Sequence, residues 1–219
     1  MKSILCFGDS NTWGYDPAGP GLPCPARFEF GKRWPNVMNA ALGGGYYIIE
    51  EALNGRTTVF KDEVLPYRSG IDALPIACLS HMPLDFVIIM LGVNDTKHRI
   101  GKLAKDIAAG MGLLIDVVRS SNCGRDGGVP EIIVVAPLIS GPVYSEAQRV
   151  SYGSGREQSI VLPKAIEEVS KTKGVHFFDS NSVAAVSQID GVHMDEKGHA
   201  ALGKALAQVI MRFHSGIIL

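Results

Sequence analysis

Short apolar runs and longer stretches of helical period alternate along the chain. Three of the runs, ILCF, FVIIML and IIVVA, are almost continuously apolar, which is typical of parallel strands that are covered on both faces. Together with two further runs they predict strands at Ser3–Phe7, Tyr46–Glu50, Phe86–Leu91, Ile132–Ala136 and Val175–Phe178.

Between these strands, apolar residues recur with the period of an α-helix. The pattern predicts helices over Trp34–Leu42, Ile71–Leu79, Leu103–Arg119, Glu157–Thr172 and Glu196–Phe213. Strands that alternate with helices predict an α/β fold in which a doubly wound parallel sheet lies between helical layers. The length of 219 residues suits a single domain over residues 1–219.

Three connecting segments are long for a compact α/β domain, namely Tyr15–Arg33, Thr57–Gly70 and Pro137–Arg156. Long loops usually carry function, as lids or interfaces. In an open parallel sheet, ligands bind at the carboxyl ends of the strands, near the switch in strand order. We therefore expect the functional residues to follow the strands directly.

The charge balance restricts the class of partner. The chain has 21 Lys and Arg residues against 22 Asp and Glu residues, and it contains no basic block, so neither nucleic acid nor a membrane surface is an expected partner. The apolar runs are far shorter than a membrane span, and those near Lys2 are too short for a signal peptide, so a cytoplasmic location is expected. Without C-x-x-C spacing, four reduced thiols are expected: Cys6, Cys24, Cys78 and Cys123.

Residues suited to acyl transfer follow the predicted strands. Ser10 comes just after the first strand, and Asp190 and His193 precede the last helix. A serine hydroxyl becomes a nucleophile when a base removes its proton, and His193 is a candidate for that base. Asp190, three residues earlier, is placed to orient the imidazole.

The oxyanion that develops during acyl transfer needs hydrogen-bond donors already in place. Candidates are the Ser10 N–H, the Gly55 N–H after the second strand and the Asn94 amide after the third. Each of these residues has a plainer role when taken alone, since serine and asparagine cap helices and Asn54-Gly55 is a strong turn pair. Their joint position at the ends of consecutive strands favours the catalytic interpretation.

Four blocks of sequence carry a resemblance to a known family: Gly8-Asp9-Ser10, Gly55, Gly92-x-Asn94-Asp95 and Asp190-x-x-His193. In this order and spacing, and over the whole chain, the sequence resembles the SGNH hydrolases, also called GDSL-type esterases. The stretches ILCFGDSNTWGY, IIEEALNGRTT, DFVIIMLGVNDTKH and DGVHMDEKGH are similar to the bacterial arylesterase/acyltransferase subgroup of that family.

The resemblance implies a flavodoxin-like three-layer α/β/α sandwich with a five-stranded parallel sheet in the order 2-1-3-4-5. It implies a Ser10–His193–Asp190 triad, an oxyanion hole of Ser10, Gly55 and Asn94, and no metal or organic cofactor. The implied activity is hydrolysis of short-chain, acetyl-like esters such as aryl or alkyl acetates. Acyl transfer to alcohols and assembly into a homo-oligomer are implied as well. Deacetylation of carbohydrates is the alternative.

Three further residues are candidates for contact with this small-molecule ester. Asn11 stands where the family usually has leucine, so it bears on the preference of the pocket. Trp13 either walls the acyl pocket or belongs to the core. Asn54 either contacts substrate or only shapes its turn.

Other residues near the site have two interpretations each. Asp95, Lys97 and His98 either begin a solvated helix or contact substrate at the rim. Tyr144 and Tyr152, in the long segment after the fourth strand, either close over the site or contact a neighbouring subunit.

Other kinds of protein compete with an esterase. The loop GDSNTWG resembles an FMN phosphate cradle, but Asp9 would place a negative charge beside the phosphate, and no G-x-G-x-x-G or Walker pattern stands in the right context. A metal site formed by Asp190, His193, Asp195 and His199 fits no standard ligand spacing, and Asp195 suits the N-cap of the last helix. An inactive binding protein has no support, because every group that catalysis needs is present.

Overall fold

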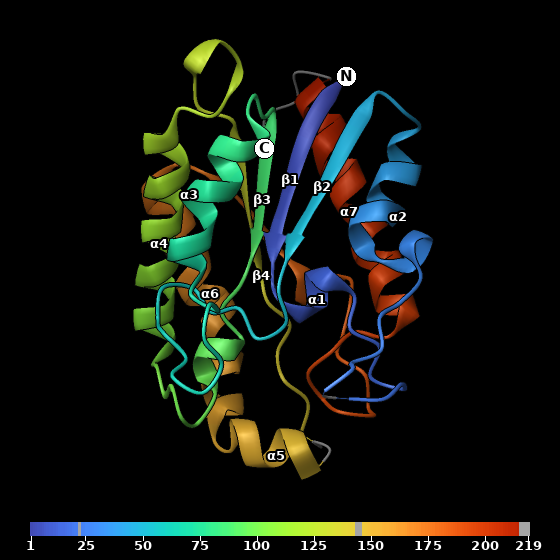
Figure 1. Ribbon diagram of the computed structural model, residues 1–219, viewed down its shortest axis with the longest axis vertical. Coiled ribbons are helices and arrows are strands. Elements are labelled where there is room, and N and C mark those ends of the chain that lie inside the picture. The colour runs from blue at the N-terminus through green and yellow to red at the C-terminus, as the bar shows by residue number, and fades with distance from the viewer. Residues whose placement is uncertain (22, 143–145, 215–219) are drawn as a thin grey trace.

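A five-stranded parallel sheet forms the centre of the molecule (Figure 1). The computed structural model describes residues 1–21, 23–142 and 146–214. The strand order β2-β1-β3-β4-β5 confirms the order that the resemblance implies. The strands are β1 (Lys2–Gly8), β2 (Tyr46–Ala52), β3 (Phe86–Met90), β4 (Glu131–Ala136) and β5 (His176–Asp179).

Every predicted helix is present, with bounds that differ from the prediction by a few residues. The helices are α1 (Ser10–Trp13), α2 (Trp34–Leu42), α3 (Gly70–His81), α4 (Ala104–Ser121), α5 (Glu146–Tyr152), α6 (Gly155–Lys173) and α7 (Glu196–His214). Helix α5 lies in a segment that was expected to be a loop. Its seven residues are too few for a helical period to be recognised in the sequence.

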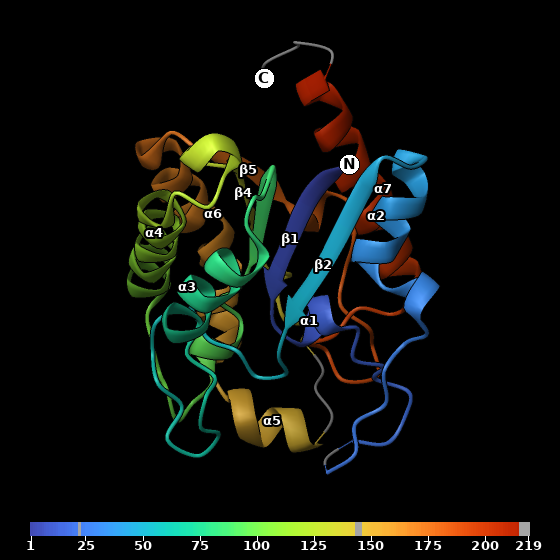
Figure 2. The ribbon, with the colours of Figure 1, turned by 45° about the horizontal axis from the view of Figure 1, so that its top comes forward.

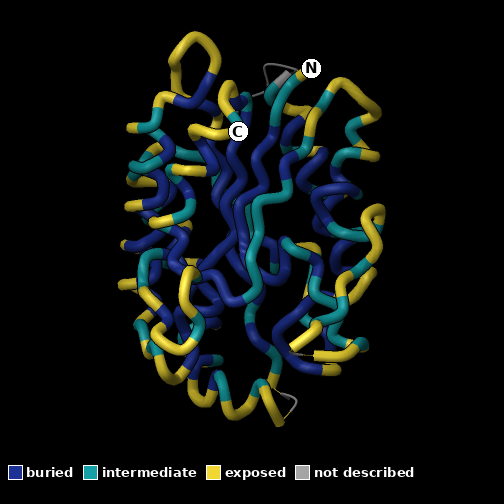
Figure 3. The backbone as a smooth tube through the Cα atoms, in the orientation of Figure 1, coloured by how far each residue is buried: buried dark blue, intermediate teal, exposed yellow. Residues whose placement is uncertain are grey.

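Two helical layers cover the sheet, with α2 and α7 on one face and α3, α4 and α6 on the other (Figure 2). Alternate residues of β1 serve the two layers, since Ile4 and Cys6 pack toward α2 and α7 while Leu5 and Phe7 pack toward α3 and α4. All four side chains are fully buried, and β1, β3 and β4 lie mostly in the interior, whereas the edge strands β2 and β5 are partly exposed (Figure 3). This is why the sequences of β1, β3 and β4 are continuously apolar instead of alternating.

All four cysteines are free, and Cys24 alone among them is exposed. Within the described residues, no helix combines the length and apolar character needed to cross a membrane.

All five strands run in the same direction, so their carboxyl ends meet at one edge of the sheet, at the bottom of Figure 1. Helix α5 crosses this edge in both ribbon views. The edge therefore has the long segments as neighbours, as the loop lengths predict.

A buried carboxyl group ties the segment Thr57–Gly70 to the end of β3. Asp95 is completely buried, and its Oδ1 accepts hydrogen bonds from the Thr58 N–H at 3.0 Å and from the Thr58 hydroxyl at 2.6 Å. Burial raises the pKa of the Asp95 carboxyl to about 7, although these bonds oppose the shift. The fold therefore disfavours the ionised form of Asp95.

We expect the contribution of Asp95 to the free energy of unfolding to depend on pH. A carboxyl whose pKa is raised by folding stabilises the fold when protonated, so this contribution is complete below about pH 4 and is lost as the pH rises through about 7. Asp95→Asn keeps an acceptor oxygen for Thr58 but cannot ionise. The free energy of unfolding of this variant should therefore fall less between low and high pH than that of the wild type. Urea unfolding at about pH 5 and about pH 8 measures the difference. If the free energy of unfolding fell equally with pH in the wild type and in Asp95→Asn, the pH dependence would not come from Asp95.

Candidate active site

The turn after β1 places Ser10 at the carboxyl edge of the sheet. Asp9 is the N-cap of α1, and its side chain accepts a hydrogen bond from the Asn11 N–H at 2.9 Å. Gly8 makes the tight passage from strand to helix possible, because a Cβ atom there would lie 2.0 Å from the Thr12 hydroxyl. Ser10 is the first residue of α1, so its N–H has no partner within the helix.

Two hydrogen bonds connect Ser10, His193 and Asp190. His193 Nε2 is 2.8 Å from Ser10 Oγ, and His193 Nδ1 is 2.5 Å from Asp190 Oδ2. The other carboxylate oxygen of Asp190 accepts the N–H groups of Val192 and His193, at 2.9 and 3.0 Å. Burial raises the pKa of Asp190, but the bonds from the imidazole and the backbone outweigh it and leave the pKa below its usual value. The arrangement can take the proton of Ser10 and stabilise an imidazolium.

A cavity of about 560 Å³ opens beside this triad, and Ser10, His193, Gly55 and Asn94 all lie in its wall. Gly55 has a φ of +82°, in the left-handed region that favours glycine. Its N–H has no hydrogen-bond partner among the described residues. Gly55 thus brings a free backbone donor to the cavity, as an oxyanion site requires.

The carboxamide of Asn94 is held in place from several sides. Its Nδ2 donates to the Arg56 carbonyl oxygen at 3.0 Å and lies 3.3 Å from Asp9 Oδ2. The Tyr152 hydroxyl donates to Asn94 Oδ1 at 3.1 Å. Burial raises the pKa of the Asp9 carboxyl to about 6. An oxyanion in the cavity would share the second amide N–H of Asn94 with Asp9.

Asn54 lines the cavity, whereas Asn11 does not. Asn54 Oδ1 is buried and has no hydrogen-bond partner among the described residues. The Asn11 side chain is occupied elsewhere, because its Nδ2 donates to the Val192 carbonyl at 3.2 Å and its Oδ1 accepts the Met194 N–H at 2.9 Å. The position of Asn11 therefore argues against the predicted substrate contact and gives it a structural role.

Trp13 is also outside the wall of the cavity, and Tyr15 lies there instead. Trp13 is partly buried, and the Arg27 guanidinium lies 4.7 Å from the centre of its ring. The ring of Tyr15 stacks on the His193 imidazole, with centroids 4.1 Å apart and planes inclined by 26°. The sequence holds no signal for this contact, because it depends on how the segment Tyr15–Arg33 folds back over the site.

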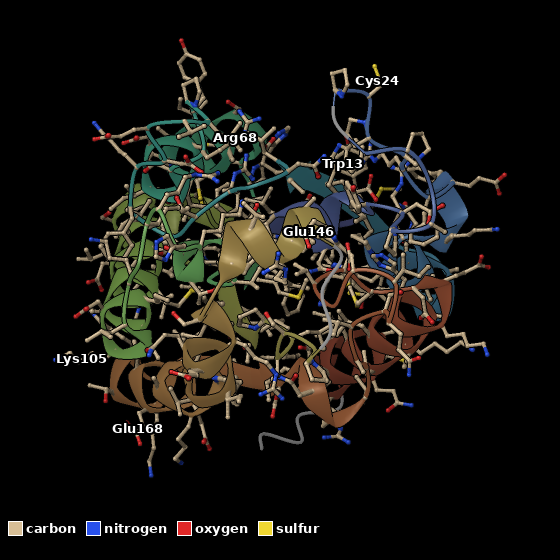
Figure 4. All side chains as sticks on the ribbon, turned by 90° about the horizontal axis from the view of Figure 1, so that it is seen from below. Trp13, Cys24, Arg68, Lys105, Glu146 and Glu168 are labelled. Carbon is tan, nitrogen blue, oxygen red and sulfur yellow. The ribbon has the colours of Figure 1, made fainter. Side chains whose placement is uncertain are left out.

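All three long segments contribute to the outer wall of the cavity, and Figure 4 looks onto this edge with α5 and Arg68 in view. Tyr152 of α5 lines the cavity, which favours the first of its two expected roles, closing over the site, while Tyr144 lies outside the described residues. Lys97 also lines the cavity and is buried, whereas His98 is not part of the wall.

His199 and Asp195 serve the fold. His199 is fully buried, its Nδ1 accepts the Trp34 N–H at 3.3 Å, and burial lowers its pKa to about 4. Asp195 Oδ1 accepts the Gly198 N–H at 2.8 Å, as an N-cap does. In the part of the chain that the structure describes, no group of three or more His, Cys, Asp or Glu side chains is arranged to hold a metal ion.

Known proteins with the same architecture include esterases. The model of the GDSL-like lipase/acylhydrolase family matches residues 6–201. An inhibitor-bound aryl esterase from M. smegmatis is 36% identical, with a TM-score of 0.91 over 96% of this chain and 99% of that one. A carbohydrate acetylesterase from Sinorhizobium meliloti is 37% identical, with a TM-score of 0.92 over 97% of this chain and 100% of that one. No curated protein matches the chain.

The two bonds of Asn11 generate a test of its structural role. Asn11→Leu leaves the Val192 carbonyl and the Met194 N–H without their partner, and each buried group left unpaired costs roughly 1–3 kcal/mol. We expect the thermal midpoint to fall by several degrees and kcat/KM for an aryl acetate to fall with it. Thermal melting and ester hydrolysis measure the two effects. Asn39→Leu, at a partly buried position of α2, is the matched control. If Asn11→Leu were as stable and active as the wild type, the two hydrogen bonds of Asn11 would contribute neither to stability nor to activity.

Proposed function

The chain belongs to the GDSL-like lipase/acylhydrolase family, and we propose that it is a serine esterase that hydrolyses short-chain, acetyl-like carboxylic esters. Aryl and alkyl acetates are the expected substrates, and the acyl group passes through an ester with Ser10. The observation that carries the proposal is the 2.8 Å contact between Ser10 Oγ and His193 Nε2 in the wall of the cavity. The likeness to an aryl esterase supports the same choice of substrate.

Acylation begins when Ser10 Oγ attacks the ester carbonyl and its proton passes to His193 Nε2. Asp190, bonded to Nδ1, stabilises the imidazolium that forms. The Ser10 and Gly55 N–H groups and the Asn94 amide receive the negative oxygen of the tetrahedral intermediate. The intermediate collapses when the alcohol leaves with the proton from His193. The products of this half are the free alcohol and the Ser10 ester.

Deacylation repeats the same proton transfers with water as the nucleophile. His193 takes a proton from water, the hydroxide oxygen attacks the acyl carbon, and the acid leaves as Ser10 regains its proton. An alcohol in the place of water would receive the acyl group, so acyl transfer is part of the proposal. The partly buried Leu65 and the buried Tyr152 in the cavity wall support it, because apolar surface lowers the local water content.

Deacetylation of carbohydrates is the second candidate function. The likeness to a carbohydrate acetylesterase favours it, and a cavity of about 560 Å³ is within the size range of small-molecule sites and larger than an acetyl group needs. An acetylated sugar and an aryl acetate would use the same triad. Assembly into a homo-oligomer and a cytoplasmic location stay predictions from the sequence.

We expect Ser10→Ala and His193→Ala each to lower kcat for 4-nitrophenyl acetate by about three orders of magnitude or more. Either change leaves only the oxyanion donors and substrate binding to act. Asp190→Ala should lower kcat less, because the carboxylate orients His193 and does not exchange protons with substrate.

Ser120→Ala is the matched control, because Ser120 is an exposed serine on α4. It should keep the wild-type rate. Near-normal hydrolysis by Ser10→Ala would overturn the assignment of the nucleophile.

A further inference from the structure

Basic side chains line the cavity beside the triad. Arg68, Lys97 and Arg99 are in its wall, and among the described residues no Asp or Glu lines it. Carboxylic esters without a charge need no such lining, so the charge of the wall carries information about the substrate. Positive side chains in a cleft attract and hold anionic ligands.

Lys97 lies beside the candidate oxyanion site. Its Nζ is 3.7 Å from the position that a Cβ atom would take on Gly55, the glycine with the free N–H. Lys97 is only 7% exposed, yet its ammonium has no hydrogen bond or ion pair with any residue that the structure describes. The ammonium also faces the ring of Tyr152, whose centre is 5.6 Å from Nζ. A buried ammonium with so few partners lacks the hydrogen bonds that normally offset its burial.

The other charges near Lys97 are already engaged. Arg99 forms a two-point ion pair with Asp62, with N–O distances of 2.9 and 2.6 Å. The buried Asp9 and Asp95 lie outside the cavity wall and accept hydrogen bonds from other residues. Burial and Arg99 lower the pKa of Lys97 to about 8, although Asp62, Asp9 and Asp95 all favour its charged form. Its charged form predominates at neutral pH.

Arg68 adds a second positive charge next to the same glycine. Its Cγ is 3.7 Å from the position of a Cβ on Gly55. The guanidinium is anchored by bonds from Nε to the Asn54 carbonyl at 2.9 Å and from Nη1 to the Pro66 carbonyl at 2.8 Å. These carbonyl groups are neutral, so the charge of Arg68 remains uncompensated by them.

We propose that the cavity selects esters whose alcohol half carries a carboxylate, which binds the Lys97 ammonium with Arg68 beside it. The inference rests on the proposed esterase function and names the substrate class of that site. The alcohol half is assigned because the expected acyl group is short and acetyl-like, so it has no room for a carboxylate. A phenolic acid or an acidic sugar that bears an acetyl group has this chemistry.

The test compares an anionic ester with its neutral partner of the same shape. The probes are 3- and 4-acetoxybenzoate and the corresponding 3- and 4-acetoxybenzamides, assayed with the wild type, Lys97→Met and Lys97→Arg. We expect Lys97→Met to lower the ratio of kcat/KM, anionic over neutral, by roughly tenfold or more for at least one isomer, because a hydrogen bond between charged groups is lost. Lys97→Arg should keep most of the ratio. The wild type and the variants are assayed with the same pairs of esters. Differences in the intrinsic reactivity of the esters therefore cancel when the ratios of the proteins are compared.

Lys105→Met, at an exposed position of α4, is the matched control and should leave both rates unchanged. Inhibition of the wild type gives a second measurement of the preference for a carboxylate. We expect 4-hydroxybenzoate to inhibit phenyl acetate hydrolysis at a lower concentration than 4-hydroxybenzamide does. Thermal melting shows whether each variant is folded.

Two results would overturn the inference. If Lys97→Met changes neither the anionic nor the neutral rate for either isomer, the ammonium does not bind the carboxylate. If Lys97→Met lowers both rates equally, so that the ratio again stays the same, the ammonium serves the oxyanion of every ester instead. Failure of the proposed function looks different, since the wild type would then hydrolyse neither phenyl acetate nor any of the acetoxybenzoates and acetoxybenzamides.

Discussion

The site depends on the hydrogen bonds that join the turn after β1 to the loop before α7. Ser10 and His193 are 183 positions apart in the chain, and their side chains meet at 2.8 Å. The carboxamide of Asn11 holds the two segments together, since it donates to Val192 on one side of His193 and accepts from Met194 on the other. Because a carboxamide is both donor and acceptor, one side chain fixes the backbone on either side of the imidazole. The geometry of the triad is thereby set by the residue next to the nucleophile.

Below the cavity, polar groups are buried but connected. Asp9 caps α1 and contacts the Asn94 amide, and Asn94 is bonded in turn to Arg56 and Tyr152. Burying such groups is unfavourable unless they are hydrogen-bonded, and a satisfied network is rigid. Rigidity matters here because oxyanion donors lower a barrier only when they are in position before the reaction begins. The ammonium of Lys97 departs from this pattern, since it is buried beside the network and has no hydrogen bond with any residue that the structure describes.

The apolar runs predicted the sheet well, because strands buried on both faces leave an unmistakable continuous pattern. The meeting of Ser10, His193 and Asp190 could also be predicted, since the carboxyl ends of parallel strands share one edge. The stacking of Tyr15 on His193 could not, because nothing local determines how a long loop returns. Nor could the burial of Lys97, because a lysine after Asn94 and Asp95 is typical of a solvated helix start. Asn11 was assigned to the pocket because the sequence shows its neighbour, Ser10, but not the distant backbone that it binds.

Labelling with an organophosphate tests the central claim, that His193 activates Ser10 as the nucleophile. The protein is treated with diethyl 4-nitrophenyl phosphate, which forms a stable phosphate ester with an activated serine, and its peptides are mapped by mass spectrometry. We expect one diethylphosphoryl group on the peptide that contains Ser10 in the wild type and none in His193→Ala. A label on another residue, or equal labelling of Ser10 in the two proteins, would contradict the account.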